Sequence, residues 1–369
     1  MKKTGVFANG LIWFGAAVSI AEIEAGCSMG GHWAALVAGH LFGGILLFAA
    51  GLLGATSGKN AMETTVSTFG SGGMRLFAAL NVLQLVGWTS VMIAQGGAAV
   101  SELTGLPVAV PCLALAVLVG VWRVVAFGER VRFAAVAMGA LAVLAAVLTV
   151  RLIGAEGVQP VGGIGFWNAF EISVAMPLSW LPLVSDYSSA AERPRLATAV
   201  SAGVYTVTSA WMYAIGILLA GIGAGSVADG IVKTGLGVAG LAIIVFSTVT
   251  TTFLDAYSAG VSANSVVAKA SPKGVGLAVC AIGGALAIGG VMDHYLGFLY
   301  LISSVFAPMA AVLLVDRYAL RRTRVPWNLG AWLAGFLAYQ FAGDSPIGPT
   351  LTAILVSAGL TFAQRLLKG

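Results

Sequence analysis

The chain has 369 residues, of which 59% are hydrophobic and 9% charged, and its mean hydropathy is +0.97. A soluble domain carries about a quarter charged residues, so this composition excludes soluble globular, disordered, coiled-coil and disulfide-stapled proteins. The net charge of +5 fits basic loops at one face of a membrane better than nucleic-acid binding. An outer-membrane barrel is excluded because its strands alternate polar and apolar residues. An all-α polytopic membrane protein remains.

The apolar residues form twelve segments, each close to the roughly 20 residues that a spanning helix needs. They run over 7–28, 33–56, 74–101, 107–126, 132–151, 164–185, 196–222, 237–266, 274–292, 294–316, 326–342 and 346–366. The first meets Glu22 and Glu24 instead of a cleavage site, so we interpret it as a membrane helix and not as a signal peptide. The polar, glycine-rich stretch 57–73 is expected to form a re-entrant or surface helix.

The distribution of Lys and Arg supports twelve crossings. If the N-terminus lies in the cytoplasm and each segment crosses once, seventeen of the nineteen Lys and Arg residues fall on the cytoplasmic side. The two exceptions are Arg151 and Lys233. The positive-inside rule describes this asymmetry. We therefore predict a multi-pass protein of the cytoplasmic (inner) membrane, with both termini in the cytoplasm.

Four carboxylates lie inside apolar segments, and no Lys or Arg lies there with them: Glu22, Glu24, Glu171 and Asp255. Charged groups in a bilayer are costly and usually face a cavity or a partner. Glu22, near the middle of its segment and close to Ser19, is the stronger cavity candidate of the first pair. Both glutamates also fit an interfacial position. Glu171 also fits a simple hydrogen bond within a kinked helix.

Other residues at similar depth favour a binding site for a flat ligand. Trp88 lies near the middle of the third segment, where an indole can stack on a ring. Pro177 and Pro182 interrupt the sixth segment beside Trp180, and proline frees backbone carbonyls. Thr250 and Thr251 lie one turn before Asp255, and their hydroxyls suit sodium. Each aromatic and hydroxyl group also fits ordinary packing or a bond back to its own helix.

The first and sixth segments are both interrupted and lie five segments apart, which is typical of transporters built from inverted repeats. This predicts a first repeat over 1–152 and a second over 153–318. The remaining residues, 319–369, are predicted to be two accessory helices.

Four stretches resemble the nucleobase–cation symporter-1 family, which includes cytosine, purine, allantoin and hydantoin permeases: WFGAAVSIAE (13–22), GWTSVMIAQ (87–95), MPLSWLPLVSDYS (176–188) and TTTFLDAYSAG (250–260). The similarity spans nearly the whole chain and is strongest to the hydroxymethylpyrimidine (CytX-type) branch. It implies a LeuT-like fold of ten core helices plus two, and cation-coupled uptake by alternating access. It also implies a sodium site at the carbonyls of Ala17 and Ile20 and the hydroxyls of Thr250 and Thr251.

The resemblance places Trp88 where the family stacks its heterocycle, but other positions depart from the pattern. Met92 stands where hydantoin-type members have Gln, and Thr252 follows the two hydroxyls where they have Asn. The family's aromatic in helix 6 aligns with Pro177, with Trp180 nearby. Recognition of a dioxo ring through amides is therefore not expected.

We expect carboxylates to recognise an aminopyrimidine, because charge-assisted hydrogen bonds to an exocyclic NH2 are strong. The predicted substrate is hydroxymethylpyrimidine, a thiamin precursor; the predicted substrate-binding residues are Ser19, Glu22, Trp88, Met92, Glu171, Trp180 and Asp255. Cytosine or another nucleobase as substrate, a proton as coupling ion, and a channel stay open as alternatives. No organic cofactor and no enzymatic activity are expected, and the three scattered histidines are expected to be structural or interfacial.

Overall fold

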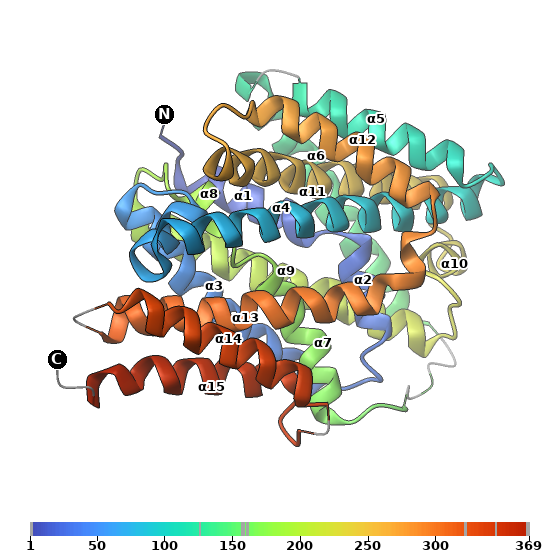
Figure 1. Ribbon diagram of the computed structural model, residues 1–369. Coiled ribbons are helices and arrows are strands. Elements are labelled where there is room, and N and C mark those ends of the chain that lie inside the picture. Colours follow the sequence, from blue (N-terminus) through green and yellow to red (C-terminus); the bar gives the residue numbers. More distant parts are fainter. Residues whose placement is uncertain are drawn as a thin grey trace.

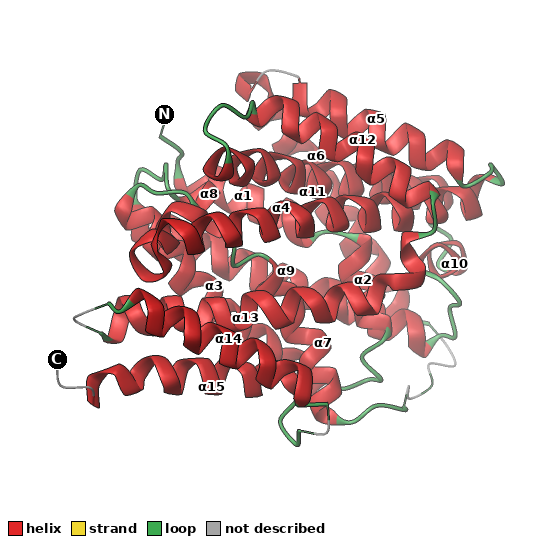
Figure 2. Ribbon diagram, in the orientation of Figure 1, coloured by secondary structure: helices red, strands yellow, loops and turns green. Residues whose placement is uncertain are grey.

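The computed structural model describes residues 3–124, 127–155, 159, 162–320, 323–343 and 345–366. In this part of the chain the structure is helical throughout (Figure 2), apart from one isolated β-bridge between Thr4 and Ala191. Side chains of residues 127–135, 137, 238 and 296 are not described. Lys2, Arg321, Arg322 and Lys368, which the positive-inside argument counts, lie outside the described residues.

The helices coincide with the predicted segments. They are α1 (Val6–Ala17), α2 (Ile20–Cys27), α3 (Trp33–Ser57), α4 (Ala61–Thr104), α5 (Ala109–Val124), α6 (Phe127–Ile153), α7 (Phe166–Ser179), α8 (Val184–Ser188), α9 (Pro194–Gly221), α10 (Val227–Lys233), α11 (Gly237–Val266), α12 (Pro272–Ile288), α13 (Tyr295–Ala319), α14 (Val325–Phe341) and α15 (Pro349–Ala363), with short 3-10 turns at Val291–His294 and Gln364–Leu366. The first segment is the pair α1–α2 and the sixth is the pair α7–α8. Eleven of the twelve predicted segments end within about five residues of the observed helices.

Length and composition agree with a membrane protein. Among the described residues, five helices are long and apolar enough to cross a bilayer, or six if the bent pair α1–α2 counts as one span. Residues at every fourth position of α3, Val37, Leu41 and Ile45, are more than half exposed. A stripe of exposed aliphatic side chains is unfavourable in water and suits contact with lipid chains.

The helices form three packed groups (Figure 1). In one group α4, α5, α11 and α12 pack against one another. In another group α1 and α2 pack against α9, α7 and α8 pack against α3, and α3 and α9 pack against each other. In the third, α13, α14 and α15 pack together. Both termini lie at the same end of the molecule (Figure 1), as an even number of crossings requires.

The predicted segment 74–101 differs from the structure, because α4 begins thirteen residues before it, at Ala61. The stretch 57–73 is not a loop, because Asn60 caps a new helix: its side chain accepts from Glu63 N, and Glu63 accepts from Asn60 N, both at 2.9 Å. Gly70, at φ +71° and ψ 177°, breaks this helix before it continues as the spanning part of α4. Residues 61–69 therefore form a short helix of their own, and their re-entrant or surface position stays a prediction.

Gly70→Ala is predicted to destabilise the protein by about 1–3 kcal/mol, because this backbone conformation is essentially restricted to glycine. A new Cβ would also lie 3.3 Å from Val325 Cγ1. The measurement is thermal unfolding of the purified protein. Gly72→Ala is the matched control, since Gly72 has open space around it and a helical backbone. Equal melting temperatures for the two variants would contradict the prediction.

Candidate functional site

The first helix is interrupted at Val18 and Ser19, in the middle of the α1–α2 pair, and bends there by 49°. Val18 and Ser19 leave helical geometry, and Ser19 restarts the helix as the N-cap of α2, where its Oγ accepts from Glu22 N at 3.2 Å. Such a cap stabilises a helix start by about 1 kcal/mol. The break therefore changes the direction of the chain between Ala16 and the first turn of α2.

A second break separates α7 from α8 at Trp180–Leu183, just after Pro177. Two buried amides of α4 satisfy the carbonyls that this break frees. Gln84 Nε2 donates to Ser179 O at 3.1 Å, and Asn81 Nδ2 donates to Pro182 O at 3.2 Å. Because an unpaired carbonyl in an apolar interior is costly, these contacts fix the unwound segment against α4.

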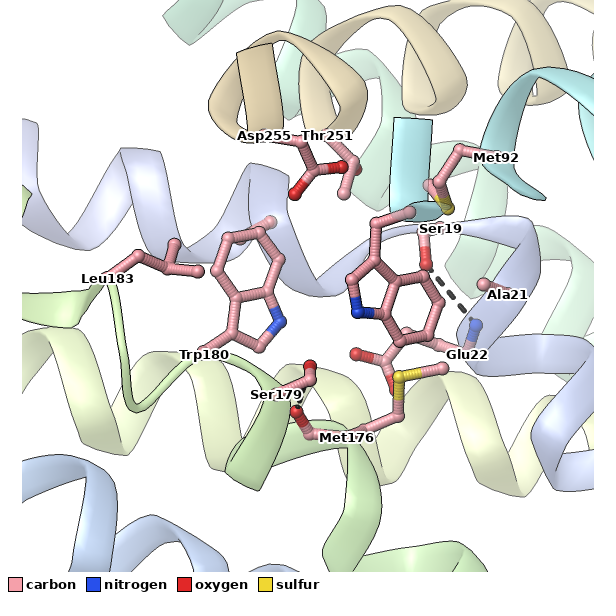
Figure 3. Close-up of a pocket in the computed structure, with 12 residues that line it drawn as sticks. Ser19, Ala21, Glu22, Met92, Met176, Ser179, Trp180, Leu183, Thr251 and Asp255 are labelled. Carbon is pink, nitrogen blue, oxygen red and sulfur yellow. Dashed lines mark hydrogen bonds between the residues drawn. The ribbon is translucent and has the colours of Figure 1, made fainter. Parts of the chain in front are cut away.

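A pocket lies between the two breaks, α4 and α11 (Figure 3). Its walls are Ala16, Ser19, Ala21, Glu22, Trp88, Met92, Met176, Ser179, Trp180, Leu183, Thr251 and Asp255. About 350 Å³ of space is empty here, including the part open to solvent.

Six of the seven residues predicted to bind substrate line this pocket: Ser19, Glu22, Trp88, Met92, Trp180 and Asp255. They come from four separate helical segments, so the tertiary structure brings together what the sequence only placed at similar depth. Binding itself stays a prediction.

Glu171 is the exception, because it was predicted to bind substrate and the structure places it outside the pocket. Its Oε1 accepts from Thr350 N at 3.0 Å, at the start of α15. The first amides of a helix lack partners within the helix and carry a partial positive charge, so a carboxylate is stabilised there. Glu171 is therefore held by the helix end on the far side of α7, and it does not line the pocket.

Glu22 is 2% exposed and its two oxygens have different partners on α9. Tyr205 donates to Oε1 at 2.8 Å, and Ser209 donates to Oε2 at 2.7 Å. These hydrogen bonds hold the carboxyl group at the edge of the pocket. Glu24, two residues along, turns away and accepts from Gln95 of α4.

Asp255 is 4% exposed and lies on the opposite side of the pocket from Glu22 (Figure 3). No hydrogen bond or ion pair from a described residue reaches its carboxyl group. A buried carboxyl group without a partner is energetically costly. Its position at the pocket wall makes it available to a ligand.

The two indoles are held from behind by other aromatic side chains. Trp180 packs edge-on against Trp13 at 5.4 Å between ring centroids, and Trp88 packs edge-on against Phe298 at 5.6 Å. Trp88 Nε1 is buried without a hydrogen-bond partner among the described residues. Both indoles are therefore fixed walls with little freedom to rotate.

The residues predicted to bind sodium are only partly brought together. Thr251 Oγ1 donates to Gly15 O of α1 at 3.0 Å, so it bridges α11 and the first break. Thr250 does not, because its hydroxyl donates back to Phe246 O at 2.8 Å in its own helix. Ala17 and Ile20 flank the break, and no backbone amide of the described residues donates to Ala17 O. Within the described chain, no cluster of three His, Cys, Asp or Glu side chains suits a transition metal.

Several residues of the site had no distinct signal in the sequence. Tyr205, Ser209, Asn81 and Gln84 are ordinary polar residues of apolar segments, and only their contacts show a role. Asn81 and Gln84 are three positions apart on α4, so their common face gives the only hint that sequence spacing offered.

No model of a known protein family matches the chain, and no curated protein does. Solved structures match over almost the whole chain. Mhp1, a nucleobase-cation-symport-1 family transporter, in a closed conformation with bromovinylhydantoin bound, has a TM-score of 0.72 and 17% identity, with 99% of this chain and 93% of that chain covered. The inward-facing conformation of Mhp1 gives the same score and identity, with 99% and 91% covered.

A Na⁺-coupled sialic acid symporter in a substrate-bound, outward-open state has a TM-score of 0.73 and 12% identity, with 99% and 90% covered. The chain has the LeuT-like transporter fold. At these identities the likeness concerns the fold, and the expected fold class is confirmed by it. The division into repeats at residues 152 and 318 stays a prediction.

Glu171→Gln is predicted to lower stability modestly, by about 0.3–1 kcal/mol, because it removes the negative charge at the start of α15. The same variant is predicted to leave ligand affinity unchanged, since Glu171 lies outside the pocket. Thermal unfolding and ligand-induced stabilisation measure the two effects. A loss of affinity comparable to that of Glu22→Gln would return Glu171 to the binding site.

Proposed function

We propose that the protein is a secondary transporter that imports a small aminopyrimidine together with a cation, with hydroxymethylpyrimidine as the first candidate. The observation that carries the proposal is the composition of the pocket. Two indoles and two buried carboxyl groups line the same pocket, and no Lys or Arg of the described residues lines it. A channel is less well supported, because interrupted helices around a central pocket favour alternating access.

The indoles of Trp88 and Trp180 suit a flat ring. Stacking of a base on an aromatic side chain contributes about 1–3 kcal/mol. The thioethers of Met92 and Met176 complete an apolar wall that adapts to the outline of a ligand. These residues explain affinity for a heterocycle but do not select among heterocycles.

The carboxyl groups supply the selectivity. When ionised, a carboxyl group only accepts hydrogen bonds, and in that form Asp255 and Glu22 suit a ligand that presents donors. An aminopyrimidine offers an exocyclic NH2 and, when its ring is protonated, an N–H beside it. A dioxo ring such as the hydantoin of the Mhp1 complex presents two carbonyl acceptors, which these groups match less well. Cytosine also carries the amino group and remains the alternative substrate.

Sodium is the first candidate for the coupling ion. Thr251 already joins α11 to the first break, and the carbonyl of Ala17 has no amide partner among the described backbone. Hydroxyl and carbonyl oxygens are the ligands of a hard monovalent cation. The position of Thr250 argues for a site centred on Thr251 and the α1 carbonyls. A proton is the alternative coupling ion.

Polar contacts join α8 to α11 beside the pocket. Besides the two α4 amides, Tyr187 of α8 donates to Leu254 O of α11 at 2.8 Å and accepts from Ser258 at 3.0 Å. Release of a ligand on this side requires these bonds to break.

The experiment that tests this proposal is thermal stabilisation of the purified protein by a ligand panel, in sodium and in potassium. The panel contains hydroxymethylpyrimidine, cytosine, uracil, hydantoin and thiamin. A ligand that binds only the folded state raises the melting temperature. We expect a shift with hydroxymethylpyrimidine that is larger in sodium. A shift with uracil or hydantoin alone would contradict the aminopyrimidine assignment, and no shift with any member would contradict the proposed substrate class.

Site variants identify the groups responsible. Trp88→Ala is predicted to weaken binding by about 1–3 kcal/mol, which is about 5- to 150-fold in Kd. Asp255→Asn and Glu22→Gln are predicted to abolish uptake while folded protein is retained. Glu102→Gln is the control, because Glu102 is bonded to Ser226 at the surface. Uptake by Asp255→Asn at the wild-type rate would remove Asp255 from the mechanism.

A further inference from the structure

One arginine joins three helices at the end of α5. Arg123, in the last turn of α5, donates from Nη2 to Pro272 O at the start of α12, at 3.2 Å. Its guanidinium lies over the ring of Tyr257 of α11, 5.6 Å from the ring centroid, and such a contact is attractive. Gly276 of α12 leaves the space for it, because a Cβ there would lie 2.9 Å from Arg123 Nε. The guanidinium is therefore held in place by α5, α11 and α12.

The two ends of this guanidinium have different surroundings. Arg123 Nε is buried and has no hydrogen-bond partner among the described residues. The contact between Nη2 and Pro272 O lies at the surface, so the forked end of the side chain is accessible from outside the bundle. This planar fork matches two oxygens of a phosphate or a carboxylate.

No carboxylate of the described residues forms an ion pair with Arg123. Asp186 of α8 lies near Tyr257, but it is buried and accepts from Ala61 N at 2.9 Å. Asp255 of α11 is buried as well and lines the pocket. A cation that is fixed in position without a carboxylate attracts an anion from outside the protein.

Two lysines add positive charge beside Arg123. Lys273 directly follows Pro272, and Lys269 lies in the short loop between α11 and α12. Asn264 holds this loop, because its Nδ2 donates to the carbonyls of Ala268 and Ala270 at 3.2 and 3.1 Å. Both lysines are exposed and form no ion pair with the described residues. We call Arg123, Lys269 and Lys273 the basic cluster.

Aliphatic side chains continue from the basic cluster along the outside of α5 and α12. Val117, Val121 and Val124 of α5 are about half exposed, and Leu277 of α12 is partly exposed. Leu277 meets α5 at Gly120, where a Cβ would lie 3.7 Å from its Cδ2. The two helices lie side by side at the edge of the bundle (Figure 1). This surface suits acyl chains, which a free phosphate ion does not have.

We propose that the basic cluster and the adjoining faces of α5 and α12 bind an anionic phospholipid. The lipid phosphate accepts hydrogen bonds from the fork of Arg123 and is attracted by Lys269 and Lys273. The acyl chains lie along the exposed aliphatic side chains of the two helices. The positive-inside prediction places this end of α5 at the cytoplasmic face, where basic residues next to membrane helices attract anionic lipids.

A lipid at this site contacts three helices of one packed group. Because α5, α11 and α12 pack against one another and against α4, a bound lipid stabilises the group that carries Trp88 and Asp255. None of the three basic residues lines the pocket. The inference therefore goes beyond the proposed function and does not depend on the substrate or the coupling ion.

The test is thermal unfolding of the purified full-length protein in a neutral detergent, titrated with phosphatidylglycerol. Phosphatidylcholine and inorganic phosphate are titrated in parallel. Because a ligand of the folded state raises the melting temperature, we expect a saturable rise with phosphatidylglycerol alone. An equal rise with phosphatidylcholine would show a general effect of lipid and overturn the proposal. An equal rise with inorganic phosphate would assign the site to a soluble anion, which also overturns it.

Variants locate the site. Arg123→Gln is expected to weaken phosphatidylglycerol binding about fivefold or more, because it removes a cation at the membrane surface. Arg123→Lys keeps the charge but loses the planar fork, so it is expected to weaken binding to a smaller extent. Arg75→Gln is the matched control, since Arg75 is an exposed arginine of α4 that the positive-inside argument places at the same face. Equal weakening by Arg75→Gln and Arg123→Gln would mean diffuse attraction and would overturn the site.

Lys273→Gln keeps the test decisive if Arg123→Gln does not fold. Lys273 is exposed, so its substitution is expected to leave the melting temperature without lipid unchanged and to weaken phosphatidylglycerol binding. Wild-type affinity in both Lys273→Gln and Arg123→Lys would overturn the proposal. Because no substrate is present, this outcome is independent of the result of the ligand panel.

Discussion

The structure depends on one constraint: backbone groups inside a bilayer must find partners within the protein. Two helices nevertheless break at mid-depth, at Val18–Ser19 and at Trp180–Leu183. The protein satisfies the freed groups with Ser19, with the amides of Asn81 and Gln84, and with Thr251. The pocket lies between the two breaks, and its walls include Asp255 and the unpartnered Nε1 of Trp88.

The same contacts connect the pocket to conformational change. Asn81 and Gln84 belong to α4, whereas the carbonyls they hold belong to the α7–α8 break, so these bonds join two helix groups that alternating access, under the proposed function, would separate. Thr251 makes a similar connection between α11 and α1. A ligand or ion that competes for these oxygens therefore acts on the contacts between the groups, and differential contacts of this kind are what allow binding to shift a conformational equilibrium.

Charge in the pocket is arranged asymmetrically. Asp255 has no partner in the described structure, whereas Glu22 has two hydroxyl donors and a connection to His40. The first arrangement leaves the Asp255 carboxyl group available to a ligand, and the second fixes the position of the Glu22 carboxyl group. Two carboxyl groups with such different surroundings are suited to different tasks, one to substrate recognition and the other to coupling.

The sequence by itself determined the class of protein and most of the helices, and it named six residues that line the pocket. Apolar length and the distribution of Lys and Arg are one-dimensional properties, so the helices followed from them within a few residues. Motifs around Ser19, Trp88 and Asp255 placed these residues at similar depth. Only the tertiary structure showed that Glu22 lines the pocket and Glu171 does not. Two carboxyl groups at similar depth differ only in which helix each one faces. It also decided that Thr251 rather than Thr250 reaches α1, and that His40 joins Glu22 through Ser209. These residues lie 133 to 236 positions from their partners, and no local pattern records a contact at that separation.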